Sequence, residues 1–357
     1  MRTPEVIAKQ HMNKGVLLYC GYNSNYNTKY TIPNDDQLRQ ILDSTDEVLL
    51  IPITTYNRYT DENGVEKVAL TREDIENMPV EWVGDPNRYE IIKGEYFATA
   101  EPKFAANYHV QDYVDIAADI AKRMVAIKPN VRLWFSVPLA ECLHALTHLF
   151  AESYVSCVHA IKRTVEPEIW ENNVQGIYYT GEDIVTSGYT KFDPTIPEQD
   201  FNNPIVYSMR KVSEVVHAYG KEMLWIPYYH DAAPSSRNLG YVVNLTNIFD
   251  TVIIQPSYFF NATRKDGLEI IAKSIERQAV LDPEFNVIGG EKKSNALIGF
   301  EMEIDSQFFN DESYVPRYYA YEEAFGKFVG KYPTAYYAGY PETLIRVGDI
   351  IKKFYNA

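Results

Sequence analysis

The sequence has few cysteines and no long apolar run. The three cysteines, Cys20, Cys142 and Cys157, show no metal-ligand spacing, and their odd number excludes a complete disulfide framework, although Cys142 and Cys157 could pair. No apolar run reaches transmembrane length, and residues 1–15 lack the apolar core of a signal peptide. We therefore expect neither a disulfide-stapled fold nor a membrane-spanning segment.

Positive charge is also scarce. The 34 Lys and Arg residues face 49 Asp and Glu residues, which gives a net charge of −15 at pH 7. Such a chain repels nucleic acids and anionic membranes, so we expect neither as a partner. The seven histidines are scattered, no nucleophilic serine motif occurs and no glycine-rich turn follows the first predicted strand. These absences argue against a metal centre, a serine hydrolase and a nucleotide cofactor, and we predict no cofactor.

Tyrosine, by contrast, is abundant, with 29 residues, and aromatics make up 14% of the chain. Tyr combines an apolar ring with a hydroxyl group, which suits stacking on sugar rings and hydrogen bonding to their hydroxyls. A tyrosine-rich core is the alternative explanation.

The most informative stretch is 295–305. Glu301, Glu303 and Asp305 alternate strictly with apolar residues such as Phe300 and Met302, and a period of two predicts a β-strand. Burying ionised carboxylates costs several kcal/mol each unless they are paired or solvated. The stretch therefore predicts a strand with one face in a core and the other toward a wet cavity, unless it is an edge strand with a solvated acidic face.

Eight strands are predicted, and most are followed by a helical pattern. The predicted strands are Gly15–Tyr19, Glu47–Thr54, Val131–Pro138, Val174–Glu182, Met223–Tyr229, Thr251–Tyr258, 295–305 and Thr334–Tyr337. The predicted helices are Pro33–Leu42, Tyr108–Ile127, Glu141–Lys162, Asn203–Ala218, Leu239–Leu245, Asp266–Val280, Arg317–Val329 and Pro341–Phe354.

This alternation predicts an α/β protein, a single (β/α)8 TIM barrel that spans residues 1–357 as one domain. Residues 56–107 form a long excursion after the second strand, which we expect to cover part of the C-terminal face of the barrel. An open doubly wound sheet is the alternative, but its usual nucleotide-binding turn is missing.

Polar and aromatic residues gather at the predicted C-terminal strand ends, where such barrels place their active sites. Paired carboxylates there are typical of glycoside hydrolysis, in which one acts as acid and the other as nucleophile or base. Glu182 ends the fourth strand, and Glu301 and Glu303 lie on the seventh, roughly opposite. The plainer explanations are a loop carboxylate at Glu182 and a buried ion pair with Arg or Lys at the other two.

Four blocks of the sequence resemble a known family. They are Gly176-Ile-Tyr-Tyr-Thr-Gly-Glu182, Leu224-Trp-Ile-Pro-Tyr-Tyr229, Ile254-Gln-Pro-Ser-Tyr-Phe-Phe260 and Gly299-Phe-Glu-Met-Glu303. In order and spacing they resemble the bacterial domain of unknown function 4855 family. The resemblance implies a barrel related to glycoside hydrolases and an extracytoplasmic location, without naming a reaction.

The chain is also loosely similar to clan A of the glycoside hydrolases. This similarity implies that Glu182 is the acid/base and that Glu301 is the nucleophile, with Glu303 close behind. That clan usually has an Asn before its acid/base, where this sequence has Gly181. Another residue must therefore hold the 2-hydroxyl of the sugar if the similarity extends to mechanism.

Together these observations predict a carbohydrate-active barrel, a retaining glycoside hydrolase that acts on an oligo- or polysaccharide. A glycan-binding barrel of a polysaccharide-utilisation system without catalysis is the alternative, and a hydrolase of another bond is a third. Trp225 and Tyr229 are the expected stacking residues, although Trp225 could instead fill the barrel interior. The full set of expected substrate-binding residues is Tyr178, Trp225, Tyr229, Asp231, Gln255 and Tyr258.

Overall fold

Eight parallel strands close into a barrel in the computed structural model, which describes residues 11–21, 31–53, 58–68, 73, 76–77, 109–137, 151–184, 204–230 and 235–356. Around the barrel the order is β1-β10-β9-β8-β7-β6-β5-β2, and every neighbouring pair is parallel. The barrel strands are β1 (Gly15–Gly21), β2 (Glu47–Ile53), β5 (Arg132–Val137), β6 (Val174–Tyr179), β7 (Glu222–Trp225), β8 (Thr251–Ile254), β9 (Leu297–Glu303) and β10 (Thr334–Tyr337). The predicted (β/α)8 barrel is thus confirmed.

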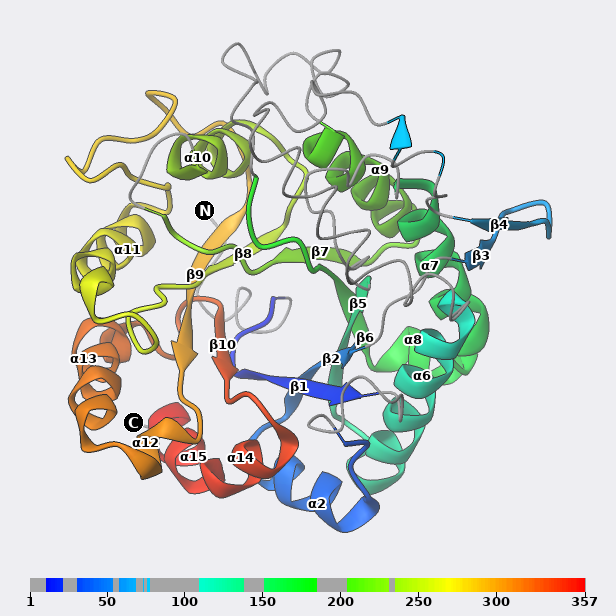
Figure 1. Cartoon of the computed structure of the whole chain (residues 1–357), viewed down its shortest axis with the longest axis horizontal. Helices are drawn as coiled ribbons and strands as arrows, with labels where there is room; N and C mark the ends of the chain where they lie inside the picture. Colours follow the sequence, from blue (N-terminus) through cyan, green and yellow to red (C-terminus); the bar gives the residue numbers. More distant parts are fainter. Residues whose placement is uncertain are drawn as a thin grey trace.

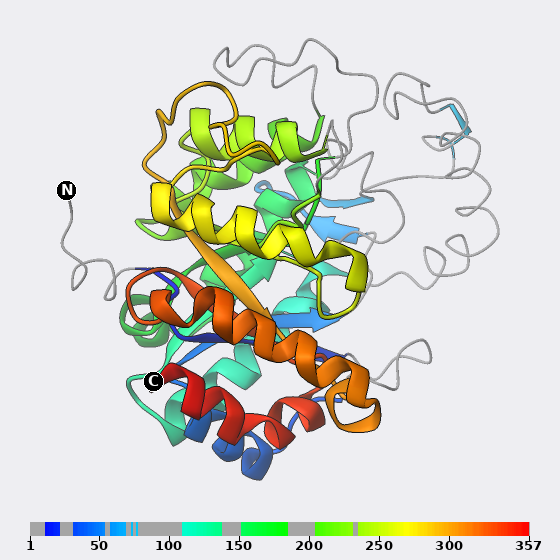
Figure 2. The ribbon, with the colours of Figure 1, turned by 90° about the vertical axis from the view of Figure 1, so that its left-hand side faces the viewer.

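Helices surround the strands as an outer ring (Figure 1). They are α2 (Asp35–Ser44), α6 (Val110–Ile127), α7 (Ala151–Thr164), α8 (Pro167–Asn172), α9 (Pro204–Ala218), α10 (Ser235–Leu245), α11 (Lys265–Arg277), α12 (Gln307–Asn310), α13 (Val315–Phe325), α14 (Pro341–Arg346) and α15 (Gly348–Tyr355). Short 3-10 turns are η5 (Ala262–Arg264), η6 (Glu312–Tyr314) and η7 (Gly326–Phe328). Figure 2 shows α11 in yellow, α13 in orange and α15 in red, one after another along the side of the barrel.

Local sequence explains why these helices form where they do. Asn34 caps α2 by accepting a hydrogen bond from the amide of Gln37, whose own side chain bonds back to the amide of Asn34. The helix then buries Leu38, Ile41 and Leu42, which recur at helical spacing. Similar apolar stripes face the barrel on the other long helices.

Parts of the outer layer differ from the sequence prediction. Helix α8 was not predicted, and the last predicted helix is two helices, α14 and α15. Within the excursion after β2, strands β3 (Arg58–Thr60) and β4 (Glu66–Val68) form a two-stranded antiparallel sheet. The Asp61 carboxylate accepts hydrogen bonds from the amides of Asn63 and Val65, which fixes the turn between them. The remainder of 69–108 lies almost entirely outside the described residues.

The alternation along the strands divides the apolar residues into two cores. Residues such as Ile298, Phe300 and Met302 of β9 face the helices in the larger core. A smaller core fills the barrel itself and includes Trp134 and Tyr178. The predicted split of β9 into an apolar outer face and a carboxyl-bearing inner face is therefore correct.

β9, which carries two of the glutamates, is fixed on both sides. The side-chain amide of Gln278, just after α11, donates to the carbonyl of Ile298 and accepts from its amide, at 2.9 and 3.0 Å. On the other side, a Cβ on Gly299 would lie 1.8 Å from the carbonyl oxygen of Pro333, so only glycine allows the chain before β10 to come this close. Both contacts hold the strand in register, and with it the position of the glutamates.

Candidate active site

Three carboxyl groups meet at the C-terminal end of the barrel. Glu301 and Glu303 lie on the inner face of β9, and Glu182 follows β6, three strands away around the barrel. They are close enough for Glu182 to shift the pKa of both other groups electrostatically. The structure thus brings together the three glutamates that the sequence singled out.

Glu303 is the most firmly held of the three. Its side chain is 1% exposed, its Oε1 accepts a hydrogen bond from the amide of Ser257 at 2.8 Å, and its Oε2 accepts one from the Tyr321 hydroxyl at 2.5 Å. Burial raises the pKa of Glu303 to about 7, while the donors from Tyr321, Ser257 and Phe259 lower it. These donors aim the carboxylate and stabilise its ionised form.

Glu301 lies two residues before Glu303 on the same face of β9, deeper in the barrel, and has a different environment. Its side chain is 2% exposed, and its Oε1 has no hydrogen-bond partner among the described residues. Burial raises the pKa of Glu301 well above its ordinary value, and the charges of Glu303 and Glu182 raise it further. The donors described above contact Glu303.

Glu182 is the carboxyl group that solvent reaches. Its side chain is exposed, yet it lies in the crowded mouth of the barrel, where partial burial raises its pKa. A hydrogen bond from the Gln255 side chain acts in the opposite direction. The amide of Tyr228 donates to the backbone carbonyl of Glu182 at 3.0 Å, which fixes the loop after β6.

Trp225 does not form a wall of the site. It is fully buried in the helix-facing core and stacks on Phe249, with ring centroids 4.9 Å apart. Its indole N–H donates to the carbonyl of Gly181 at 2.6 Å. Contrary to the expectation, Trp225 therefore does not offer a ring to a sugar. It does not fill the barrel interior either, which was the alternative. Trp225 instead anchors the residue before Glu182.

The same region explains the glycine at position 181. A Cβ there would lie 2.9 Å from the ring of Tyr179. An asparagine at this position would require the buried ring of Tyr179 to shift. The side-chain amide beside the Glu182 carboxyl group belongs instead to Gln255. This side chain hydrogen-bonds to Glu182 and donates to the carbonyl of Ile226.

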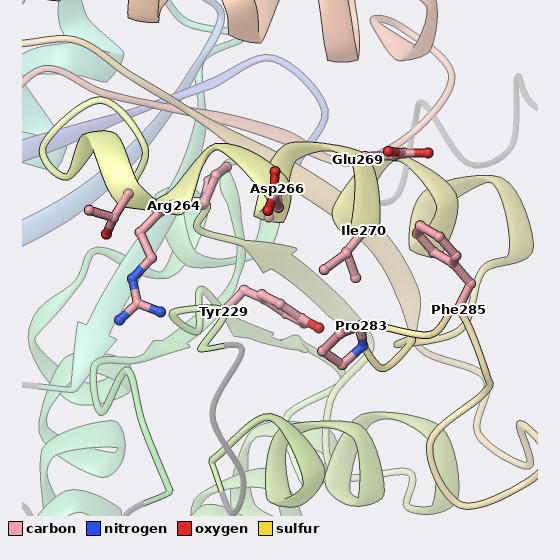
Figure 3. A pocket seen from close by; sticks show the side chains of 10 residues that line it. Tyr229, Arg264, Asp266, Glu269, Ile270, Pro283 and Phe285 are labelled. Atoms are coloured by element: carbon pink, nitrogen blue, oxygen red, sulfur yellow. The ribbon is translucent and has the colours of Figure 1, made fainter.

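Tyr229 also packs in the helix-facing core, and 2% of it is exposed. Its hydroxyl donates to the carbonyl of Leu281 at 3.1 Å. It borders a hollow of about 390 Å³ on the outer side of the barrel, which Arg264, Asp266 and Phe285 also line (Figure 3). The hydroxyl thus contributes a hydrogen bond within the fold. The ring is too buried to stack on a sugar, contrary to our expectation.

The other expected binding residues divide between the barrel interior and its rim. Tyr178 is 2% exposed and lies inside the barrel, near Glu182 and Glu301. Tyr258 is half-buried and stacks on Tyr321, with ring centroids 6.3 Å apart. Asp231 lies outside the described residues.

The sequence reasoning missed several aromatic residues at the site. Tyr19 at the end of β1 is near Glu182 and Glu301, and its ring meets that of Tyr337 edge-on with centroids 5.4 Å apart. Tyr337 in turn contacts Phe260, whose side chain is 42% exposed. Tyr19 and Tyr337 occupy positions that face the barrel interior in the alternation of their strands. This alternation was the signal that could have identified them.

Three further features concern possible metal ligands, membrane-spanning helices and cysteines. Within the described ranges, no group of three or more His, Cys, Asp or Glu residues is arranged to hold a metal ion. None of the helices in the described part of the chain has the length and apolarity to cross a membrane. Cys20 and Cys157 are buried free thiols, whereas Cys142 lies outside the described residues.

The chain belongs to the family called Domain of unknown function (DUF4855). The family matches residues 174–353, which include all four sequence blocks and the three glutamates. None of the curated proteins matches the chain significantly.

Solved structures show distant likeness. A protein from Aquifex aeolicus VF5 has a TM-score of 0.38 at 9% identity, with 99% of this chain and 95% of that chain covered. The GH20 catalytic modules of the pneumococcal exo-β-D-N-acetylglucosaminidase StrH give 0.42 at 10% identity, with coverage of 98% and 83%. A chitinase from Chromobacterium violaceum gives 0.29 at 13% identity, with coverage of 69% and 56%. These scores are too low for a residue-by-residue comparison of sites.

Proposed function

We propose that this chain is a carbohydrate-active barrel that hydrolyses glycosidic bonds with retention of configuration. The observation that carries the proposal is the meeting of Glu182, after β6, with the donor-held Glu303 at the end of β9. Two carboxyl groups facing each other at the C-terminal end of a barrel are the working groups of such a hydrolase.

Glu182 suits the role of acid and base. It is exposed in the barrel mouth, so it can exchange its proton with water after each turnover, and partial burial raises its pKa, which favours the protonated form. In the first step its proton passes to the glycosidic oxygen as the bond between that oxygen and the anomeric carbon breaks. In the second step it accepts a proton from the attacking water.

Glu303 suits the role of nucleophile. The Ser257 amide and the Tyr321 hydroxyl hold its two oxygens in place and favour its ionised form. Its carboxylate would form an ester with the anomeric carbon in the first step, and water would replace it there in the second. This assignment exchanges the roles that the sequence suggested for Glu301 and Glu303.

The test is hydrolysis of a panel of neutral, amino and uronic polysaccharides, with the anomer of the first product followed by proton NMR. On an active substrate we expect the retained anomer, and we expect Glu182→Gln and Glu303→Gln each to lower turnover by roughly 10²–10⁴. Glu323→Gln, which changes an exposed glutamate of α13, is the matched control and should leave turnover unchanged.

A 2-deoxy-2-fluoro glycoside of the active sugar identifies the nucleophile directly. We expect it to label Glu303, as read by peptide mapping, whereas a label on Glu301 would return the role to that residue. If Glu182→Gln and Glu303→Gln both keep full activity, the hydrolase assignment is wrong.

A further inference from the structure

Glu301 is a buried acid, and one of its two carboxyl oxygens has no hydrogen-bond partner among the described residues. Its side chain is 2% exposed and points into the barrel, and the unpaired oxygen is Oε1. A buried polar atom without a partner is costly and rare in folded proteins. Glu303, two residues further along the same strand, receives donors on both of its oxygens. The unpaired Oε1 of Glu301 is therefore specific to that position and not to the strand.

In the described part of the chain, the titratable groups that interact with Glu301 are carboxyl and phenol groups. The titratable side chains that interact with it are Glu303 on β9, Glu182 after β6, Tyr178 on β6, Tyr19 on β1, Tyr321 on α13 and Tyr355 on α15. Its partner in register on β10 is Ala335. No Lys or Arg belongs to this set in the described part of the chain, so the buried ion pair that would explain Glu301 structurally is not formed there.

This environment favours one protonation state of Glu301. Burial and the two neighbouring carboxyl groups disfavour a negative charge on Glu301, so they raise its pKa and favour the protonated form. A protonated carboxyl group has an O–H that donates one hydrogen bond. Because the described residues offer no acceptor to Oε1, a ligand oxygen is the natural recipient.

We propose that Glu301 is a substrate-binding residue, a neutral carboxylic acid that donates a hydrogen bond to a hydroxyl oxygen of an uncharged sugar. The identity of the ligand as a sugar rests on the proposed function, whereas the neutral state of Glu301 does not. Glu301 then selects among sugars, because an anionic sugar at this depth meets Glu303 and Glu182. Uronic acid units are thus excluded from the innermost position.

Infrared spectroscopy tests the neutral state without a substrate. In the difference spectrum between the wild type and Glu301→Gln at pH 7, we expect the carbonyl stretch of a protonated carboxylic acid. A difference spectrum that contains only carboxylate bands overturns the proposal. Glu323→Gln, at an exposed position, is the control and should not show that band.

The pH dependence of stability gives a second test that needs no substrate. The folded-state pKa of Glu301 is raised above the unfolded value of about 4.3, so its stabilising contribution is complete below that pH and is lost as pH rises toward the folded pKa. We therefore expect the urea midpoint of the wild type to fall more between pH 5 and pH 8 than that of Glu301→Gln. Parallel curves for these two proteins overturn the proposal, and Glu323→Gln should follow the wild type.

A glycan array separates the sugar assignment from the hydrolase assignment. We expect the wild type to bind uncharged glycans, Glu301→Gln to bind them within about threefold, and Glu301→Met, which has no donor, to bind about tenfold more weakly. Preference for uronic or cationic amino glycans, equal losses in both variants, or no binding of any uncharged glycan by the wild type overturns the sugar assignment. Binding with this pattern but without hydrolysis leaves the role of Glu301 intact and removes only the proposed catalysis.

Discussion

The amide of Ser257 donates a hydrogen bond to Oε1 of Glu303 over 2.8 Å, and it does so from a left-handed backbone conformation with a φ of 55°. For a residue other than glycine, this conformation costs roughly 1–2 kcal/mol. Ser257 lies three residues after β8, at the rim of the barrel. Strain of this kind persists where surrounding contacts impose it, and here it directs an N–H at a buried carboxylate.

Substitution of Ser257 should separate strain from function. Ser257→Gly keeps the N–H and tolerates the conformation, so we expect turnover to be retained and the free energy of unfolding to rise by up to about 1 kcal/mol. Ser257→Val adds a β-branched side chain that resists positive φ, so both stability and turnover should fall. Urea unfolding and initial rates measure the two effects, and a valine variant as stable as the wild type would contradict this explanation.

Tyr321 links Glu303 to the loop after β8. Its hydroxyl donates to Glu303 and accepts from the amide of Phe259 at 2.9 Å. Tyr321→Phe removes the acceptor of that hydrogen bond and should lower the free energy of unfolding by roughly 1–3 kcal/mol. It also removes a donor to the carboxylate, so the pKa of Glu303 should rise further.

The acidic limb of the rate profile reports this pKa. A nucleophile must be ionised, so activity should rise with pH through the pKa of Glu303, which is about 7 in the free protein, and the limb should move to higher pH in Tyr321→Phe. Tyr319→Phe, on the exposed side of α13, is the control. Superimposable profiles for Tyr321→Phe and the wild type would show that the hydroxyl does not act on Glu303.

The sequence predicted the inner and outer faces of β9 because its polar and apolar residues alternate. Glu301 and Glu303 could only share a face, and Phe300 could only pack on the helices. The regular alternation of strands and helices likewise predicted the barrel. These features depend on local periodicity, which a single sequence displays directly.

The role of Trp225 could not be predicted in this way. In β7 the residues Met223, Leu224 and Trp225 are all apolar, so periodicity does not indicate which of them faces the helices. The donors to Glu303 were equally hidden. A serine with positive φ has no marker comparable to glycine. Tyr321 reaches the site from α13, and the helical pattern there does not show which hydroxyl contacts the strand before it.

At the opposite end of the barrel, Glu47 holds the segment that precedes β1. It is 2% exposed and accepts hydrogen bonds from the Asn13 amide at 2.9 Å and the Trp134 indole at 2.8 Å, with Arg132 nearby at 3.3 Å. Removing one partner of a buried ion pair costs roughly 3–5 kcal/mol. We expect Glu47→Gln to lower the free energy of unfolding by about 3 kcal/mol, measured in urea. Turnover should be unchanged, because the three glutamates of the candidate site lie at the other end of the barrel.

The control for Glu47 is an exposed pair. Glu171 is 69% exposed and lies 3.7 Å from Lys162, so Glu171→Gln should cost less than about 1 kcal/mol. Equal losses from the two substitutions would mean that burial does not strengthen the contacts of Glu47.

Phe260 is the residue that we expect to stack on a sugar. Its ring is 42% exposed and leads through Tyr337 to Tyr19, which lies beside Glu182 and Glu301. An exposed aromatic ring adds little to stability but offers a face to an apolar partner. Phe260→Ala should therefore weaken binding of an oligosaccharide substrate about fivefold, equivalent to about 1 kcal/mol, and leave the urea midpoint nearly unchanged.

Phe260→Trp should retain binding, and Tyr319→Ala, which removes another exposed ring from α13, should not affect it. If Phe260→Ala and Tyr319→Ala bind equally well, the aromatic series from Phe260 to Tyr19 does not guide the substrate.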